Sequence, residues 1–371
     1  MRTAITDMIG CEYPIVAFSH CRDVVAAVTH AGGFGVLGVA GRLPEELDVE
    51  LRWLDEHTGG RGYGVDALIP RKVEQVGASG GHVPEEHRRF VADLLARYDV
   101  PELPADEAER VRASAGRADA MVARASELWD VISEHPVTMF VSALGPPPAD
   151  LVEKAHAKGV VVGGLAGAVQ HAERQKAAGV DLVVAQGSEA GGHCGEIATM
   201  VLVPDVVDAM DGTPVLAAGG IATGRQMAAA LSLGAAGVWT GSVWLTTQEA
   251  ETHPVVKEKM LAASASDTVR SRSSTGKHAR QLVSAWTREW EDPANPDPLG
   301  MPHHSELIAE AKARIGRGAH VRGSGSEQLV NYFVGQVVGR MRSVRPARRV
   351  LEEIVAEYAD TVARIERINA G

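Results

Sequence analysis

A glycine-rich segment around His193 carries the residue types best suited to chemistry. Four glycines lie between Ala185 and Glu196, directly after the apolar run 180–184. That run is short and β-branched, which is typical of a buried parallel strand. Glycines let backbone N–H groups approach a ligand closely. Because α/β folds place their chemistry at the carboxyl ends of parallel strands, His193 is predicted to exchange a proton with a substrate. The alternative is a histidine that only hydrogen-bonds its neighbours.

Two further glycine-containing turns predict a phosphate site. Gly219 and Gly220 follow the apolar run 214–218 and precede a predicted helix that starts at Arg225. Several N–H groups and the positive end of the helix dipole could converge there on an anion. Gly241 and Ser242 end the apolar run 237–240. Loops after the seventh and eighth strands of a barrel commonly bind phosphate, so a phosphate-bearing ligand is predicted.

The elements that must position these loops alternate along the chain between strand-like and helical runs. Such alternation indicates parallel strands joined by helices, and eight of them predict a (β/α)8 TIM barrel. The predicted strands are 13–18, 35–38, 63–69, 137–142, 160–163, 180–185, 214–218 and 237–240. The predicted helices between them are 23–30, 44–57, 150–158, 168–178, a helix reaching about residue 210, and 225–233.

The alternation is interrupted by a predicted helical insertion at about 71–135. Its two apolar faces comprise Phe90, Val91, Leu94, Leu95 and Tyr98, and then Val111, Met121, Val122, Leu128, Trp129 and Ile132. The insertion either covers the site or packs on the outside of the barrel.

The end of the chain no longer alternates. Residues 1–250 are assigned to the barrel and 251–371 to a helical segment that packs back on it. The predicted C-terminal helices are 255–263, 280–291, 306–314, 329–341 and 346–368.

Composition limits the class of partner. The 371 residues are 45% hydrophobic and 23% charged, an ordinary globular composition. The net charge of -11 argues against nucleic acid and anionic membranes, which require clustered cations. No run approaches a membrane span and the first residues lack a signal-peptide pattern, so we expect a cytoplasmic protein with small-molecule partners. The spacing of the cysteines and nearby histidines fits neither a disulfide framework nor a zinc site; the residues weighed are Cys11, His20, Cys21, His193 and Cys194.

The motifs resemble those of the nitronate monooxygenase, or 2-nitropropane dioxygenase-like, family. The resemblance rests on segments 186–193, 217–221 and 233–238, and extends more weakly to 31–35, 275–280 and 335–336. It implies an FMN-dependent (β/α)8 barrel that oxidises nitronates or nitroalkanes with O2 to carbonyl compounds and nitrite.

The resemblance also implies roles for individual residues. His193 would remove the acidic proton next to the nitro group or hydrogen-bond the substrate anion. The FMN phosphate would lie on Gly219, Gly220, Gly241 and Ser242 with Ala218 beside it, and the flavin along Gln186, Gly187 and Gly192.

Two positions depart from the family pattern. The segment 17–22 replaces the usual Gln and Met-containing turn, and Phe18 and His20 within it are expected to shape the substrate pocket, with a core role as the alternative for Phe18. Asp66 replaces a common Asn on the third strand. A carboxylate can accept the flavin ring N–H but adds negative charge beside it, so Asp66 is predicted to shift the flavin potential or the specificity.

Other functions remain open at this point. The nearest is an NAD(P)H-dependent flavin reductase of quinones or enoyl thioesters; a separate GxGxxG motif is absent, but transient use of NAD(P)H needs none. A flavin-free isomerase or lyase and a non-catalytic flavin protein are further alternatives. O2 or another acceptor would take the electrons, and a homo-oligomer is compatible with the sequence. Four further polar residues are left out of the catalytic set: Glu189, Arg225, His303 and His304. Glu189 could be a second acid but more often such a carboxylate fixes its loop, and Arg225 could contact phosphate or be a solvated side chain.

Overall fold

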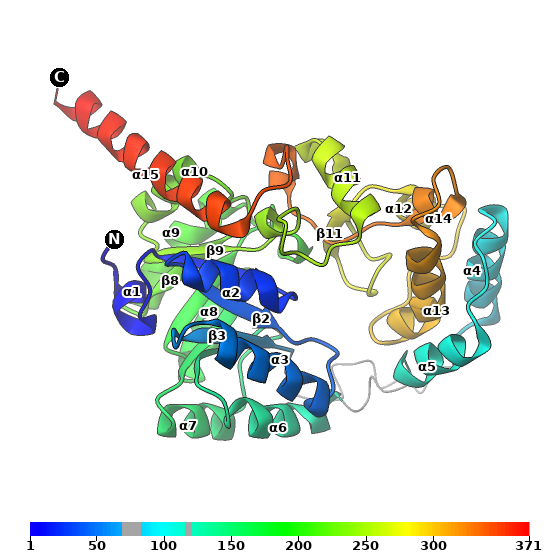
Figure 1. Cartoon of the computed structure of the whole chain (residues 1–371), viewed down its shortest axis with the longest axis horizontal. Helices are drawn as coiled ribbons and strands as arrows, with labels where there is room; N and C mark the ends of the chain where they lie inside the picture. The colour runs from blue at the N-terminus through cyan, green and yellow to red at the C-terminus, as the bar shows by residue number, and fades with distance from the viewer. Residues whose placement is uncertain (69–82, 116–120, 371) are drawn as a thin grey trace.

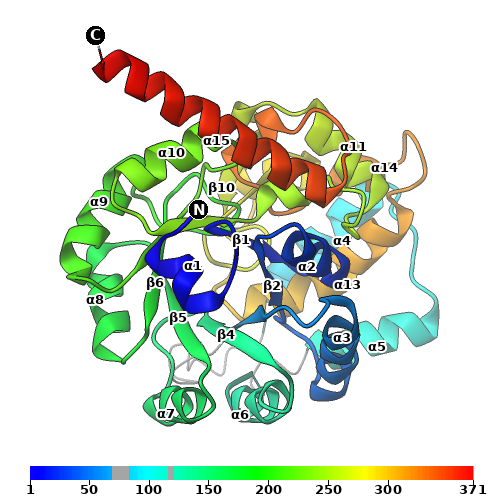
Figure 2. The same cartoon turned by 60° about the vertical axis from the view of Figure 1, so that its left-hand side comes forward.

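Eight parallel strands close into a barrel in the computed structural model, which describes residues 1–68, 83–115 and 121–370. Each strand pairs with its neighbour along the chain, and β9 returns to pair with β1 (Figure 2). The (β/α)8 prediction is therefore confirmed. The barrel strands are β1 (Ile15–Ser19), β2 (Phe34–Gly38), β3 (Tyr63–Ala67), β4 (Val137–Ser142), β5 (Val161–Ala166), β6 (Leu182–Gln186), β8 (Val215–Ala218) and β9 (Gly237–Thr240).

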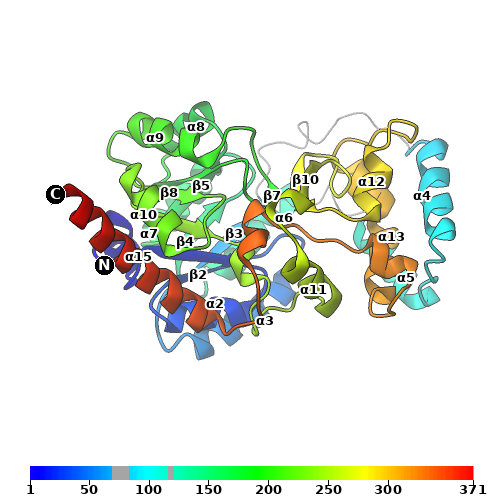
Figure 3. The same cartoon turned by 90° about the horizontal axis from the view of Figure 1, so that it is seen from above.

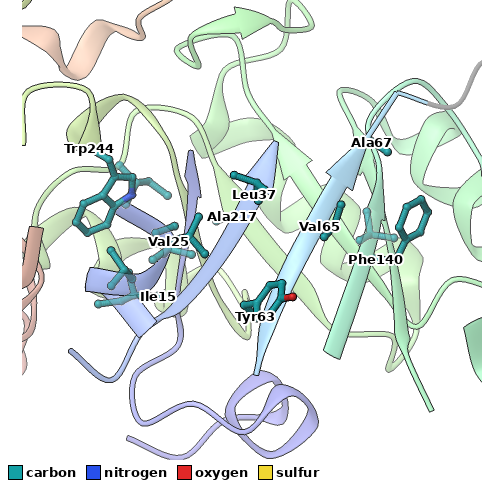
Figure 4. Packing of buried hydrophobic residues seen from close by; sticks show 14 of the residues in the cluster. Ile15, Val25, Leu37, Tyr63, Val65, Ala67, Phe140, Ala217 and Trp244 are labelled. Atoms are coloured by element: carbon teal, nitrogen blue, oxygen red, sulfur yellow. The ribbon is translucent and has the colours of Figure 1, made fainter. Parts of the chain in front are cut away.

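Alternating side chains of these strands divide between the barrel interior and an outer layer. The interior cluster includes Val16, Val36 and Leu216. Their neighbours Ile15, Leu37 and Ala217 point outward into the layer beneath the helices, as Figure 4 shows. Because both faces are covered, the strands read as nearly continuous apolar runs in the sequence.

A short helix that the sequence analysis did not predict closes one end of the barrel. In α1 (Ala4–Ile9), Ile5 and Ile9 belong to the interior cluster. Thr3 caps this helix by accepting from the Thr6 amide. Figure 2 shows α1 lying across the strands at the end where they begin. The opposite end, where the strands finish, is left for the ligand loops.

The helices that surround the barrel include one from the far end of the chain. α15 packs against α10 and α2, and so fills the ring position after β9. Its last turns extend beyond the barrel, as the red helix in Figure 1 shows. The surrounding helices are α2 (Arg22–His30), α3 (Pro44–His57), α6 (Met121–Ile132), α7 (Ala149–Ala157), α8 (Val169–Ala177), α9 (Thr199–Met210), α10 (Gly224–Ser232) and α15 (Ala347–Asn369).

A second hydrophobic core joins the insertion to the C-terminal segment. The predicted apolar face of α4, including Phe90 and Leu94, packs with Trp286 and Ile315 from the other end of the chain. Figures 1 and 3 show α4, α12 and α13 together, away from the barrel. The elements here are α4 (Glu85–Arg97), α5 (Ala105–Ala115), α11 (Pro254–Ala262), β10 (Thr268–Ser271), β11 (Ala279–Leu282), α12 (Ala285–Glu291), α13 (His303–Gly318) and α14 (Gly325–Leu329).

The two predicted faces of the insertion thus have different partners. Trp129 and Ile132 of α6 join the outer layer of the barrel, whereas α4 joins the second core. Met121 and Val122 lie outside the residues whose side chains the structure describes. A division of the chain at about residue 250 stays a prediction.

Two predicted C-terminal helices are wrong in part. Residues 279–282 form β11, which pairs with β10, and only α12 beyond it is helical. The predicted helix 329–341 is instead the end of α14, an extended segment and a 3-10 helix (Gln336–Arg340). In both places hydrogen bonds to distant chain segments replace helical ones, as in the bridge between Gln281 and Phe333.

Boundaries elsewhere shift by a few residues. β3 ends at Ala67, and the rest of its predicted range includes positions outside the described residues. The helix expected at 306–314 runs from His303 to Gly318. All three cysteines are free. In the described part of the chain, no helix is long and apolar enough to cross a membrane.

Candidate functional site

Hydrogen bonds from several other segments hold the glycine loop that follows β6 in place. Within it, the two-residue strand β7 (Gly192–His193) pairs with β11, so that His193 lies opposite Ala279. Arg280 of β11 donates from Nε to the Ser188 carbonyl at 2.9 Å. Gln336 donates its amide to the Glu189 carbonyl at 3.0 Å. Segments from the C-terminal part of the chain therefore set the position of His193.

Glu189 ties the same loop to the start of α9. Its carboxylate accepts from the Thr199 amide at 2.9 Å and from the Thr199 hydroxyl at 2.8 Å. A Cβ on Gly187 would overlap Thr199, so only glycine allows this close approach. These contacts agree with the structural interpretation of Glu189.

The imidazole of His193 is suited to accept a proton at neutral pH. Burial lowers its pKa below the ordinary 6.5, and the nearby Lys277 ammonium acts in the same direction. Its Nε2 lies 2.8 Å from the Thr275 hydroxyl oxygen. That hydroxyl also lies 3.2 Å from the Lys277 carbonyl, to which it can donate. If it does, His193 Nε2 carries the hydrogen and Nδ1 is the basic nitrogen.

Two loops at the mouth of the barrel present free amide groups. Gly219 and Gly220 adopt φ values of 93° and 71°, which favour glycine. The amides of Gly219, Gly220, Gly241 and Ser242 donate no hydrogen bond to any residue that the structure describes. A group of unpaired N–H donors on adjacent loops fits an anion such as phosphate.

The two amide-bearing loops are joined to the rest of the site. Thr199 lies 3.0 Å from the Gly219 carbonyl through its hydroxyl. Ser242 accepts from the Gly335 amide at 2.8 Å, which leaves its own hydroxyl hydrogen free to donate. The loops that present the unpaired amides and the loop of His193 thus share supporting contacts.

The first turn of α10 has a different role from the predicted one. Glu357 of α15 accepts from the Gly224 amide at 2.8 Å and from Arg225 Nε at 2.7 Å. A carboxylate of the protein therefore takes the place at this helix start that the sequence analysis gave to the ligand anion. The amides of Gly219 and Gly220, in the turn before the helix, have no such partner among the described residues.

The side chains of Asp66 and Gln186 face the barrel interior near the carboxyl ends of β3 and β6. Asp66 alternates with Gly64, whose Cβ would meet the interior side chains Phe34 and Val36. Burial raises the pKa of the Asp66 carboxyl from 3.8 to about 7. The carboxylate makes no hydrogen bond to a described side chain or amide. Gln186 and Ala218 are neighbours in the β6–β8 pairing, and Gly192 with φ of 75° has open space where a Cβ would point.

Phe18 and His20 form one wall of the mouth. Their rings meet edge to face with centroids 5.1 Å apart, and Phe18 stacks on Trp239 at 6.0 Å. His20 Nδ1 lies 2.9 Å from the Gly38 carbonyl oxygen, and burial lowers the pKa of the His20 imidazole. A Cβ on Gly38 would collide with both rings. Phe18 also packs against the interior core, which agrees with its alternative interpretation.

Sequence reasoning missed several supporting residues. Thr275, Arg280 and Gly335 lie in segments that carry the weak family resemblance, which was the only signal for them. Phe333, whose ring centroid is 6.4 Å from that of His193, gave no signal. His303 and His304 lie on α13, where His304 is fully buried and its Nε2 is 3.0 Å from the Ser273 carbonyl.

A closed (β/α)8 barrel with unpaired turn amides and a buried imidazole on the loops after its strands has the arrangement of an enzyme of the barrel class. The chain belongs to the nitronate monooxygenase family, whose model matches residues 2–357. Family membership makes it an oxidoreductase and implies a flavin cofactor.

Relatives and solved structures agree with this assignment. The chain is 56% identical over 376 residues to the "Putative monooxygenase Rv1533" of Mycobacterium tuberculosis, with 99% of each chain covered. It is 26% identical over 371 residues to a "Probable nitronate monooxygenase" of Staphylococcus aureus, covering 95% of this chain and 96% of the relative.

Two solved structures cover nearly the whole chain. The nitroalkane oxidase from Streptomyces ansochromogenes has a TM-score of 0.81 at 26% identity, covering 98% of this chain and 100% of that one. FabK from Thermotoga maritima has a TM-score of 0.74 at 27% identity, covering 99% of both chains.

Proposed function

We propose that the protein is an FMN-dependent nitronate monooxygenase that oxidises nitronates or nitroalkanes with O2 to carbonyl compounds and nitrite. The proposal rests on one observation. A cradle of unpaired amides and the His193 imidazole lie on loops that shared hydrogen bonds hold together. The first suits a flavin mononucleotide phosphate, and the second suits proton removal from carbon.

The residues present fit FMN. The unpaired amides of Gly219, Gly220, Gly241 and Ser242 would hold the phosphate, with Ala218 beside it. Gln186, Gly187 and Gly192 would lie along the flavin, and Asp66 would accept a hydrogen bond from its ring N–H. The bound FMN would supply the redox chemistry, taking electrons from the substrate and delivering them to oxygen.

His193 is proposed to be the base for neutral nitroalkanes. A lowered imidazole pKa keeps the ring unprotonated at neutral pH, and a nitro group makes the adjacent C–H acidic enough for such a base. A nitronate has already lost this proton. His193 would then serve only to hydrogen-bond the substrate anion, which requires a hydrogen on Nδ1, as in the other tautomer or the imidazolium.

A spectroscopic experiment tests the function. The visible spectrum of the purified protein is recorded, and a preformed nitronate or NADPH is added separately without oxygen. We expect the nitronate to bleach the flavin and nitrite to appear once air is admitted. Rapid bleaching by NADPH alone would instead support a reductase of quinones or activated alkenes.

The role of His193 needs a second comparison. His193→Asn should lower kcat/KM for a nitroalkane by about 10²-fold or more, and lower it much less for the preformed nitronate. His171→Asn, at an exposed position on α8, is the control. Equal losses for the two substrates would contradict a role in proton removal.

A further inference from the structure

Lys312 on α13 is a cation in unusual surroundings. Its Nζ donates to Asn331 Oδ1 at 2.9 Å and to Ser274 Oγ at 3.3 Å, and lies 4.7 Å from the centre of the Trp286 ring. No carboxylate pairs with it in the described part of the chain. Burial lowers its pKa to about 7. A lysine that is costly to bury and has no counter-ion calls for a functional explanation.

The two partners of Lys312 belong to a compact polar cluster. Gln281 Oε1 accepts from Ser274 Oγ at 2.6 Å and from Asn331 Nδ2 at 2.8 Å. Lys312, Ser274, Gln281 and Asn331 therefore connect three segments, which are residues 274–281, helix α13 and the segment around Asn331. We name these four residues the Lys312 cluster.

Residues of the Lys312 cluster are close in the sequence to the residues that contact His193. Ser274 precedes Thr275, whose hydroxyl is 2.8 Å from His193 Nε2. Asn331 is two residues from Phe333, the aromatic ring beside His193. Gln281 lies on β11, the strand that pairs with β7 and its His193. The segments that carry Thr275, β11 and Phe333, each of which contacts His193, therefore each contribute a residue to this cluster.

We propose that Lys312 is a positioning residue for His193, because its ammonium group ties together the segments that carry Thr275 and Phe333. The expected effect of Lys312 on turnover rests on the proposed role of His193. The expected effect of Lys312 on the position of the His193 ring does not. Without the ammonium group, Asn331 Oδ1 loses its donor and the two segments lose one of the links between them. The link through Gln281 Oε1 remains, so we expect the spacing of the segments to change while they stay in contact. A displacement of the imidazole of about 1 Å is enough to lower turnover strongly.

The test compares Lys312→Met with Arg317→Met in the full-length, FMN-loaded protein. Arg317 lies on the same helix and pairs at the surface with Glu107. The readouts are kcat and KM for a neutral nitroalkane, which needs proton removal, and the ¹⁵N signals of His193, assigned by their loss in His193→Asn. We expect Lys312→Met to shift the His193 signals and to lower kcat on the order of tenfold, while Arg317→Met changes neither.

A second variant guards against misfolding. Ser274→Ala removes one oxygen and should shift the His193 signals in the same direction. If both variants act through the cluster, the double variant should lose less than the product of the two single losses. Unchanged His193 signals in Ser274→Ala and Lys312→Met, or fully multiplicative losses, would overturn the proposal.

The experiment can reject the positioning role of Lys312 and the proposed function independently of each other. A shifted His193 signal in a protein that does not oxidise nitronates would support the positioning role and reject the function. A normal His193 signal with a raised KM alone would reject positioning and indicate that Lys312 contacts the substrate.

Discussion

Asp66 is the residue whose ionisation should be visible in stability. Its carboxyl titrates near 3.8 in the unfolded chain and at about 7 in the folded one. Between these pH values the folded state binds more protons than the unfolded state, so the free energy of unfolding falls as pH rises. Asp66→Asn should remove this fall in the FMN-free protein. Urea unfolding at pH 5 and pH 8 measures it.

Asp150→Asn, at an exposed position on α7, is the control for this pH effect. A wild-type protein whose stability changes between pH 5 and pH 8 as much as that of Asp66→Asn would rule out the raised pKa.

The same carboxylate should affect the flavin. A negative charge beside a ring that gains charge on reduction disfavours the reduced state. Asp66→Asn is therefore expected to raise the flavin reduction potential at pH 8, where Asp66 is ionised. An equilibrium reduction against a dye of known potential measures this, and an unchanged potential would count against Asp66 lying beside the flavin.

Gly219 tests the amide cradle. Alanine at φ of 93° is strained by about 1–2 kcal/mol, and its Cβ would press on the Gly187 carbonyl. FMN affinity should fall by at least about tenfold, which corresponds to 1.4 kcal/mol. Gly212→Ala is a matched control, because Gly212 has φ of 87° and open space around it. Titration of the FMN-free variants measures the difference; an equal loss for both would show strain alone.

At the scale of elements, Glu357 joins α15 to the barrel. It accepts hydrogen bonds from the first turn of α10, where a negative charge is favoured. Glu357→Ala should lower the free energy of unfolding by about 1–2 kcal/mol because a helix-start amide loses its acceptor. Glu352→Ala on the same helix removes only exposed pairs with Arg348 and Arg349 and should cost less than about 0.5 kcal/mol. Thermal unfolding distinguishes them, and equal losses would contradict a special role for Glu357.

Elements of the barrel were predictable because their signals are local. Apolar runs such as 180–184, bounded by glycines, predict strands wherever they occur. β11 was not predictable, since Arg280 and Gln281 adopt an extended conformation only through pairing with β10 and β7. The same holds for the site. His193 and the glycines lie in recognisable loops, whereas Thr275 is 82 residues away from His193 in the sequence, and Lys312 acts through partners that only the fold brings together.

At the scale of the whole molecule, the barrel carries the loops proposed to hold the cofactor, and the part built around the second core, the second lobe, supports His193. The amides of the cradle belong to barrel loops, while β11, Thr275 and Phe333 come from the segment packed around the second core. Folding of that core should therefore control the position of His193 with less effect on the cradle. Cavities placed in each core can separate the two contributions.

Leu94 on α4 and Leu54 on α3 are both fully buried, the first in the second core and the second in the outer layer of the barrel. Each change to alanine should cost about 2–5 kcal/mol. Only Leu94→Ala should speed amide hydrogen exchange in β11, because α4 stabilises the second lobe, which holds β11. It should also lower kcat/KM by a larger factor than it lowers FMN affinity. Exchange monitored by mass spectrometry over residues 279–282 provides the measurement. If Leu54→Ala loosened β11 equally, the two cores would unfold as one unit and α4 would have no separate influence on His193.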